Sequence, residues 1–209
     1  MTIDAPDIDM SFAEPADADQ LERAAKALRG NGFTVDIVDT VAEARARVRD
    51  LLPRDQGIFT ANSQTLQLSG IAADIEESAD FESVRRRAAR LGDDFAAQLK
   101  LGAAPDVVVG SVHAITEQGQ MVAASATGSQ LASYAAGALR AIWIVGAQKV
   151  VPDLDTALRR VRSYSLPLEW RRSRQATGQP SFIGKILIFE REALPDRATV
   201  ILVREAIGF

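Results

Sequence analysis

The 209-residue chain contains no cysteine and only one histidine, His113. Without a thiol it can form no disulfide, no cysteine-ligated iron–sulfur cluster and no thiolate zinc site, and it has no cysteine nucleophile. A catalytic zinc ion usually takes two or three imidazole ligands, so a single histidine is also too few for that kind of site. We therefore predict no metal and no cofactor, and a structural or merely polar role for His113.

Long apolar runs and a basic surplus are absent as well. The longest apolar stretches have the length of a strand, and the acidic first residues do not resemble a signal peptide. The 24 basic and 28 acidic residues leave a net charge of −4, which argues against a dedicated nucleic-acid binder. Arginine clusters at residues 85–87 and 171–174 are interpreted as a solvated helix face and a charged loop, with an acidic partner as the alternative for the loop. We predict a cytoplasmic protein that binds neither membranes nor nucleic acids.

Strand-like and helix-like segments alternate along most of the chain, as in a largely parallel sheet with helices on both faces. The fold class predicted is therefore α/β with three layers. Residues 1–15 are acidic and poorly patterned, so we expect a mobile segment there and a single domain over residues 16–209. Helices are expected at 19–30, 41–52, 64–68, 81–101, 130–136 and 154–161, and strands at 33–38, 57–61, 107–109, 114–116, 120–124, 141–145, 186–189 and 199–203.

Three details of this pattern are specific enough to test. Residues 114–124 read as a β-hairpin that turns at Gly119. The last two strands, joined by a short turn, are expected to pair with each other in antiparallel fashion. In the long helix over residues 81–101, the face expected to be buried carries Val84, Ala88, Leu91, Phe95 and Leu99.

The motifs of the common nucleotide and hydrolase sites are missing: the chain has no GxGxxG turn, no GxxxxGK[ST] loop and no GxSxG elbow. Small polar residues instead follow two of the predicted strands, and a lysine follows a third. Parallel α/β sheets bind ligands at the carboxyl ends of their strands, where backbone N–H groups can hold an anion. The alternatives are ordinary helix capping, plain loops and a solvated lysine. The candidate binding residues are Asn62, Ser63, Gln64, Thr65, Ser125, Thr127, Gly128, Ser129 and Lys149.

Glu117 is the candidate catalytic residue. It lies in the predicted hairpin turn beside Gly119, between two apolar segments. A carboxylate that faced a pocket could act as a general base or as a nucleophile. On pattern alone, a solvated turn residue is the alternative.

Three of these segments together resemble the LUD domain, a family that includes the lactate-utilisation protein C subunits. They are Ser63-Gln64-Thr65-Leu66, residues 114–119 (AITEQG) and residues 145–152 (VGAQKVVP), and the likeness extends from about residue 57 to residue 209. The resemblance implies a fold similar to NagB/RpiA sugar-phosphate isomerases and CoA transferases. It also implies a link to the oxidation of L-lactate to pyruvate, with partner subunits that carry cysteine-rich iron–sulfur modules.

One element departs from that family. Lactate-associated members often show Gly-Asn or Gly-Asn-Arg where this chain has Thr127-Gly128-Ser129-Gln130. The missing arginine leaves a carboxylate or phosphate ligand without a bidentate partner at this position.

Three hypotheses for the function follow from these residues. The leading one is a LUD-type subunit that binds a small anionic metabolite and works with iron–sulfur partner subunits in organic-acid utilisation. The second is a free-standing enzyme of the sugar-phosphate isomerase or CoA-transferase type that uses Glu117. The third is a purely structural assembly partner, which would need no pocket.

Overall fold

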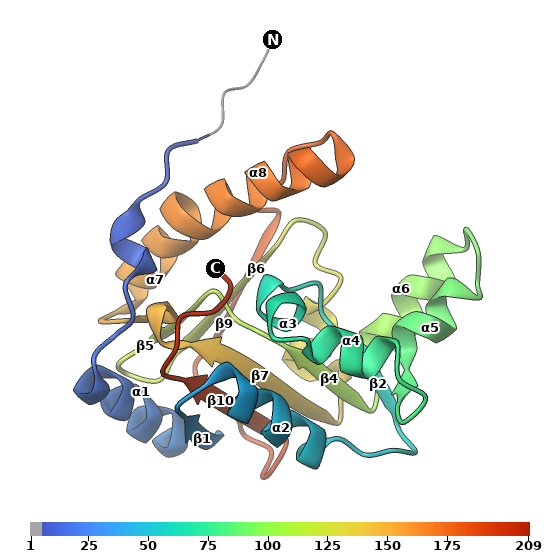
Figure 1. Ribbon diagram of the computed structural model, residues 1–209, viewed down its shortest axis with the longest axis horizontal. Coiled ribbons are helices and arrows are strands. Elements are labelled where there is room, and N and C mark those ends of the chain that lie inside the picture. The colour runs from blue at the N-terminus through green and yellow to red at the C-terminus, as the bar shows by residue number, and fades with distance from the viewer. Residues whose placement is uncertain (1–5) are drawn as a thin grey trace.

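Six parallel strands form the main sheet, in the order β1-β10-β7-β4-β2-β3 (Figure 1). The structure is a computed structural model that describes residues 6–209. Each strand pairs with its neighbours in parallel register, so all six carboxyl ends meet at one edge. The strands are β1 Thr34–Val38, β2 Gly57–Thr60, β3 Glu82–Ser83, β4 Val107–Gly110, β7 Arg140–Gly146 and β10 Ala198–Val203.

Alternate side chains of these strands enter two different cores, because successive residues of a strand point to opposite faces. On one face, Val107, Ile142 and Ile201 pack against α2, α3 and α4. On the other, Val108 and Trp143 pack against α1 and a second, smaller sheet. The three-layer α/β fold is thus confirmed. The helices named are α1 Ala18–Gly30, α2 Val41–Leu51, α3 Gln64–Leu68 and α4 Ile71–Glu76.

The second sheet has four strands, in the order β8-β5-β6-β9. Its β5 and β6 form the predicted antiparallel hairpin, and Gly119 at the turn has a φ of 80°. Helix α7 (Leu154–Arg160), capped by Asp153 as its spacing indicates, covers the outer face of this sheet. The strands are β5 Ala114–Thr116, β6 Met121–Ser125, β8 Val150–Val151 and β9 Lys185–Phe189.

The predicted antiparallel pair at the end of the chain is wrong. Strand β9 pairs with β6 in the small sheet, whereas β10 lies between β1 and β7 in the main sheet. All six residues of β10 are buried. A continuous apolar run of this kind is typical of a central parallel strand, and it outweighs the short connection from β9.

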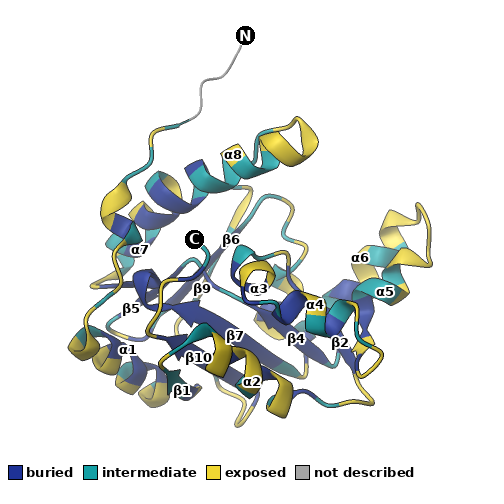
Figure 2. Cartoon of the chain, viewed as in Figure 1, coloured by how far each residue is buried: buried dark blue, intermediate teal, exposed yellow. Residues whose placement is uncertain are grey.

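The long helix predicted over residues 81–101 is also interrupted. The structure has α5 (Val84–Ala89) and α6 (Phe95–Ala103), separated by a turn in which Gly92 has a φ of 58°. The break changes the helical phase, so Leu91, Phe95 and Leu99 are 41, 70 and 46% exposed instead of buried. Exposed residues accordingly run along α5 and α6 in Figure 2. Because alanine and arginine favour helix on both sides, composition does not reveal the break.

Part of the segment expected to be mobile, residues 6–15, contacts the rest of the molecule, and residues 1–5 lie outside the described part. Residues Met10–Ala13 form a 3-10 helix, η1, and Phe12 is buried against Tyr164. The backbone N–H of Asp9 donates to the carbonyl of Ser163 at 2.8 Å. This segment therefore belongs to the packed part of the molecule.

Candidate anion-binding site

A cavity of about 360 Å³ opens at the carboxyl edge of the main sheet. Segments that follow β2, β4, β6 and β7 line one side of it. The other side is formed by helix α8 (Leu166–Thr177) and the residues that follow this helix, up to Ile183. A volume of this size suits a small metabolite.

Seven of the nine candidate binding residues line this cavity. The other two lie directly behind its wall: Thr65 is buried and contacts Lys149, and the N–H of Gly128 donates to the Ser125 hydroxyl at 2.9 Å. The parallel main sheet brings the segments after β2 and β7 to one edge, and the loop after β6 of the small sheet reaches the same cavity. The seven lining residues are Asn62, Ser63, Gln64, Ser125, Thr127, Ser129 and Lys149.

Lys149 is the most unusual of these residues, because its side chain is only 1% exposed. Its Nζ donates to Thr65 Oγ1 at 2.9 Å and to Ser111 Oγ at 3.1 Å. Within residues 6–209 it forms no ion pair with a carboxylate. Burial, and then the nearby guanidinium of Arg160, lower the pKa of Lys149 well below its ordinary value. The 3-10 turn η3 (Ala147–Lys149) after β7 holds the lysine in this place.

A second cation, Arg160, is buried behind the cavity wall. It donates to the carbonyls of Gln148 and His113 and to the Ser165 hydroxyl, but its Nη2 has no partner among the described residues. Burial lowers the pKa of Arg160 to about 10, so the guanidinium stays charged near neutral pH. The wall behind Lys149 therefore carries positive charge, and Glu169, the acid on the other side of the cavity, is paired with Arg172.

The single imidazole lines the same cavity. His113 Nδ1 accepts a hydrogen bond from the Ala124 backbone N–H at 3.1 Å. Burial, with Lys149 and Arg160 nearby, lowers the pKa of His113 to about 3, so the ring is neutral near pH 7. Because Nδ1 is the acceptor, the proton lies on Nε2, and the ring offers one N–H donor.

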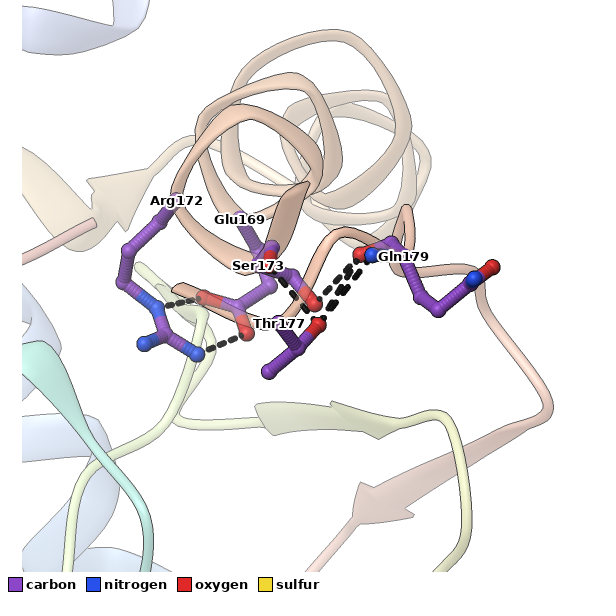
Figure 3. Close-up of polar contacts among 5 residues, drawn as sticks. All are labelled: Glu169, Arg172, Ser173, Thr177 and Gln179. Atoms are coloured by element: carbon purple, nitrogen blue, oxygen red, sulfur yellow. Dashed lines mark hydrogen bonds and ion pairs between the residues drawn. The ribbon is translucent and has the colours of Figure 1, made fainter. Parts of the chain in front are cut away.

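Helix α8 contributes the one guanidinium of the described cavity lining. Arg172 Nε and Nη2 donate to the two carboxylate oxygens of Glu169, at 2.7 and 2.6 Å, as Figure 3 shows. At the end of the helix, the hydroxyl of Ser173 donates to the carbonyl of Gln179 and that of Thr177 to the carbonyl of Ser173. The charged loop predicted at residues 171–174 is thus wrong. This segment is helical, because α8 begins at Leu166, directly after the π-helical turn η4 (Val161–Ser165), with Pro167 in its first turn.

Glu117 does not line the cavity, although it was expected there as a base or nucleophile. It accepts hydrogen bonds from Arg23 at 2.7 Å and from Gln20 at 3.3 Å, both on α1. The hydrogen bond from Arg23 is the main cause that lowers the pKa of Glu117. Ligands bind at the carboxyl ends of parallel strands such as those of the main sheet, whereas the turn that carries Glu117 belongs to the small sheet. Gly119 packs so closely on α1 that a Cβ would lie 2.6 Å from the Ala27 backbone.

The sequence analysis missed Ser111, Tyr134 and Arg172. The Tyr134 hydroxyl donates to the Ser111 carbonyl and accepts from the Ser111 N–H, each at 3.0 Å. Gly110 makes room for this contact, since a Cβ there would lie 1.7 Å from the hydroxyl. Ser111 directly follows β4 as Asn62-Ser63 closely follows β2, and this parallel could have revealed the serine. The signal for Arg172 was its spacing from Glu169, which pairs two charges on one helix face.

Two further classes of site were sought in the described residues. Within residues 6–209, no group of three or more His, Asp or Glu side chains is arranged to hold a metal ion. Nor does that range contain a helix with the length and apolar character needed to cross a membrane.

Comparison with known proteins agrees with the geometry. The sequence profile of the LUD domain matches residues 21–203. The chain belongs to the LUD domain family. This LUD domain is also similar in structure to a DUF162 family protein from Deinococcus radiodurans, with a TM-score of 0.55 at 15% identity. The alignment covers 90% of this chain and 99% of that one, and it supports the fold alone. No curated protein matches this LUD domain in sequence.

Proposed function

We propose that this LUD domain binds a small anionic metabolite, a carboxylate or a phosphate, in the cavity beside Lys149. We propose further that it does so as a subunit of an organic-acid utilisation system, in which L-lactate is oxidised to pyruvate. The observation that carries the binding proposal is a buried lysine that, among residues 6–209, has two hydroxyl partners and no carboxylate partner.

The energetics of burial favour a bound anion. Removing a charged amine from water costs several kcal/mol unless a counter-charge or hydrogen bonds compensate it, and the amine otherwise loses its proton. An anion in the cavity supplies the counter-charge and favours the protonated lysine. The neutral His113 ring and the hydroxyls of Ser63, Ser125 and Thr127 supply further donors.

Arg172 suits the role of bidentate partner that the Thr127–Gln130 loop lacks. A guanidinium that already holds the Glu169 carboxylate through two parallel hydrogen bonds presents the geometry that a ligand carboxylate needs. A ligand carboxylate that took the place of the Glu169 carboxylate on Arg172 would be held between α8 and the sheet. We expect Arg172→Ala to weaken binding of carboxylates.

The partner proposal depends on the absence of cysteine from the chain. An oxidation of lactate releases two electrons, and this chain has no thiolate to ligate a cluster that accepts them. Iron–sulfur partner subunits would supply that step. The enzyme alternative, an isomerase or CoA transferase that uses Glu117, gains no support from a carboxylate paired with Arg23 outside the cavity.

Isothermal titration calorimetry with L-lactate, pyruvate and inorganic phosphate tests the binding proposal. We expect at least one of them to bind, and Lys149→Met to weaken it by about 10- to 100-fold, the scale of a lost charged hydrogen bond. Lys100→Met, on the exposed surface of α6, is the matched control and should bind as the wild type does. Equal affinities for wild type and Lys149→Met would contradict the proposal.

A further inference from the structure

We propose that Lys149 forms a covalent imine with the carbonyl group of a small 2-oxo acid in the cavity. This inference rests on the proposed function, since it requires that the cavity admit an organic anion. It adds to that function a covalent reaction, a reacting atom and a class of ligand that carries both a carbonyl group and a carboxylate.

The geometry places an amine where a carbonyl carbon can approach it. Lys149 lines the cavity, and the two hydroxyls bonded to its Nζ, those of Thr65 and Ser111, are 3.3 Å apart. These hydroxyls fix the position of the amine. Unlike a carboxylate, they do not supply a negative charge that would favour its protonated form. A hydroxyl both donates and accepts a proton, so each can pass one between the nitrogen and the reacting oxygen.

The protonation state of the amine agrees with this geometry. Only an uncharged amine has the lone pair that attacks a carbonyl, and an ordinary surface lysine is almost entirely protonated near pH 7. Burial and the charge on Arg160 lower the pKa of Lys149 well below that ordinary value. A bound carboxylate raises this pKa again, so the attack comes from the share of the amine that stays uncharged in the complex. A buried lysine next to another cation is a known way to obtain a nucleophilic amine.

The reaction balances without an oxidant or a reductant. The Nζ lone pair attacks the carbonyl carbon, and the oxygen takes a proton that the nitrogen releases, which gives a carbinolamine. The nitrogen lone pair then forms the C=N bond as the hydroxyl leaves, and the proton that remained on the nitrogen passes to this hydroxyl, which gives water and a neutral imine. When the imine nitrogen is protonated it bears one positive charge, which compensates the ligand carboxylate inside the cavity.

The use of lysine at this position is itself informative. The chain contains 20 arginines and only four lysines, Lys26, Lys100, Lys149 and Lys185. The other two fully buried basic side chains, Arg160 and Arg197, are arginines, which hold carbonyls and carboxylates but form no imine of this kind under physiological conditions. The buried base that faces the cavity is the lysine.

Reductive trapping tests the inference directly. The purified full chain is incubated with pyruvate and sodium cyanoborohydride, and the adduct is located by peptide mass spectrometry. We expect one reduced pyruvyl group per chain, on Lys149, at least about tenfold above the level on the three exposed lysines. L-lactate, which has no carbonyl group, should give no adduct, and hydroxyacetone, which has no carboxylate, should react at least about tenfold more slowly.

The controls separate this inference from the proposed function. Lys149→Arg retains a cation and should give no adduct above the level of the exposed lysines. Mapping in the wild type gives an answer even if that variant folds poorly. Pyruvate that binds by calorimetry but leaves Lys149 unmodified, or that labels all four lysines equally, would overturn the imine and leave the anion site intact. If no anion binds at all, both proposals fail.

Discussion

Arg197 and Lys149 are both buried basic residues, and they lie at opposite ends of the main sheet. Arg197 directly precedes β10, pairs with Glu192 at 2.7 Å and donates to the carbonyls of Ala138, Ser133 and Tyr134. Lys149 follows β7, and its partners in the part of the chain that the structure describes are two hydroxyls. The folded chain itself thus supplies Arg197 with a counter-ion and hydrogen-bond acceptors, whereas Lys149 leaves room for an external anion.

This difference separates a residue that stabilises the fold from one that costs stability. Removing a buried charge that has its counter-ion and hydrogen bonds in place destabilises the fold strongly. A buried charge that lacks a counter-ion can often be replaced by an apolar residue without loss of folding stability. Binding sites commonly retain groups of the second kind. Four predictions test the contrast, from the largest expected effect to the smallest.

Arg197→Met should lower the free energy of unfolding by about 3–5 kcal/mol, because it leaves Glu192 and three carbonyls without their partner. Urea unfolding followed by circular dichroism measures this value. Arg191→Met, an exposed position nearby, should change it little. A loss below about 1 kcal/mol for Arg197→Met would mean that the two buried cations do not differ.

Lys149→Met should raise the free energy of unfolding of the ligand-free protein by about 1–3 kcal/mol, because the desolvated amine is replaced by an apolar chain of similar length. Thr65 and Ser111 keep other acceptors, the carbonyls of Ile207 and Val112. The same urea titration measures the change. A loss of stability comparable to that of Arg197→Met would refute this account of Lys149.

His113→Asn should reduce the loss of stability on acidification. The folded pKa of about 3 lies below the ordinary 6.5, so the unfolded chain binds more protons between these values and stability falls as the pH falls through that window. Asparagine keeps an acceptor for the Ala124 N–H but does not titrate. Urea titrations at pH 7, 6, 5 and 4 should therefore show a shallower decline for the variant. Parallel declines would exclude His113 as a cause.

Glu117→Gln should have the smallest effect. Its pair with Arg23 is partly exposed, and such pairs contribute little, so Tm should fall by at most about 2 °C. Ligand affinity measured by calorimetry should stay unchanged, because the residue lies outside the cavity. A large loss of affinity would return Glu117 to the site.

Much of the main sheet could be predicted from the sequence, because Val107–Gly110 and Arg140–Gly146 are short apolar runs followed by polar turns. The same reasoning located the segments after β2 and β7, since parallel strands bring their ends together, whereas the Ser125–Ser129 loop reaches the cavity from β6 of the small sheet. It failed for β9 and β10, where sheet membership depends on long-range pairing, and for Glu117, whose turn docks on α1. The spacing of Arg172 from Glu169 indicates that the two pair on one helix face, but only the packing of α8 brings this pair to the cavity.

We infer that Lys149 is held uncharged until an anion enters the cavity. NMR of the protein labelled with carbon-13 at lysine Cε tests it, because the chain has only four lysines. One signal, absent from Lys149→Met, should titrate well below the other three, and L-lactate should raise its pKa. Four signals that all titrate in the ordinary range, with no response to L-lactate, would contradict the claim.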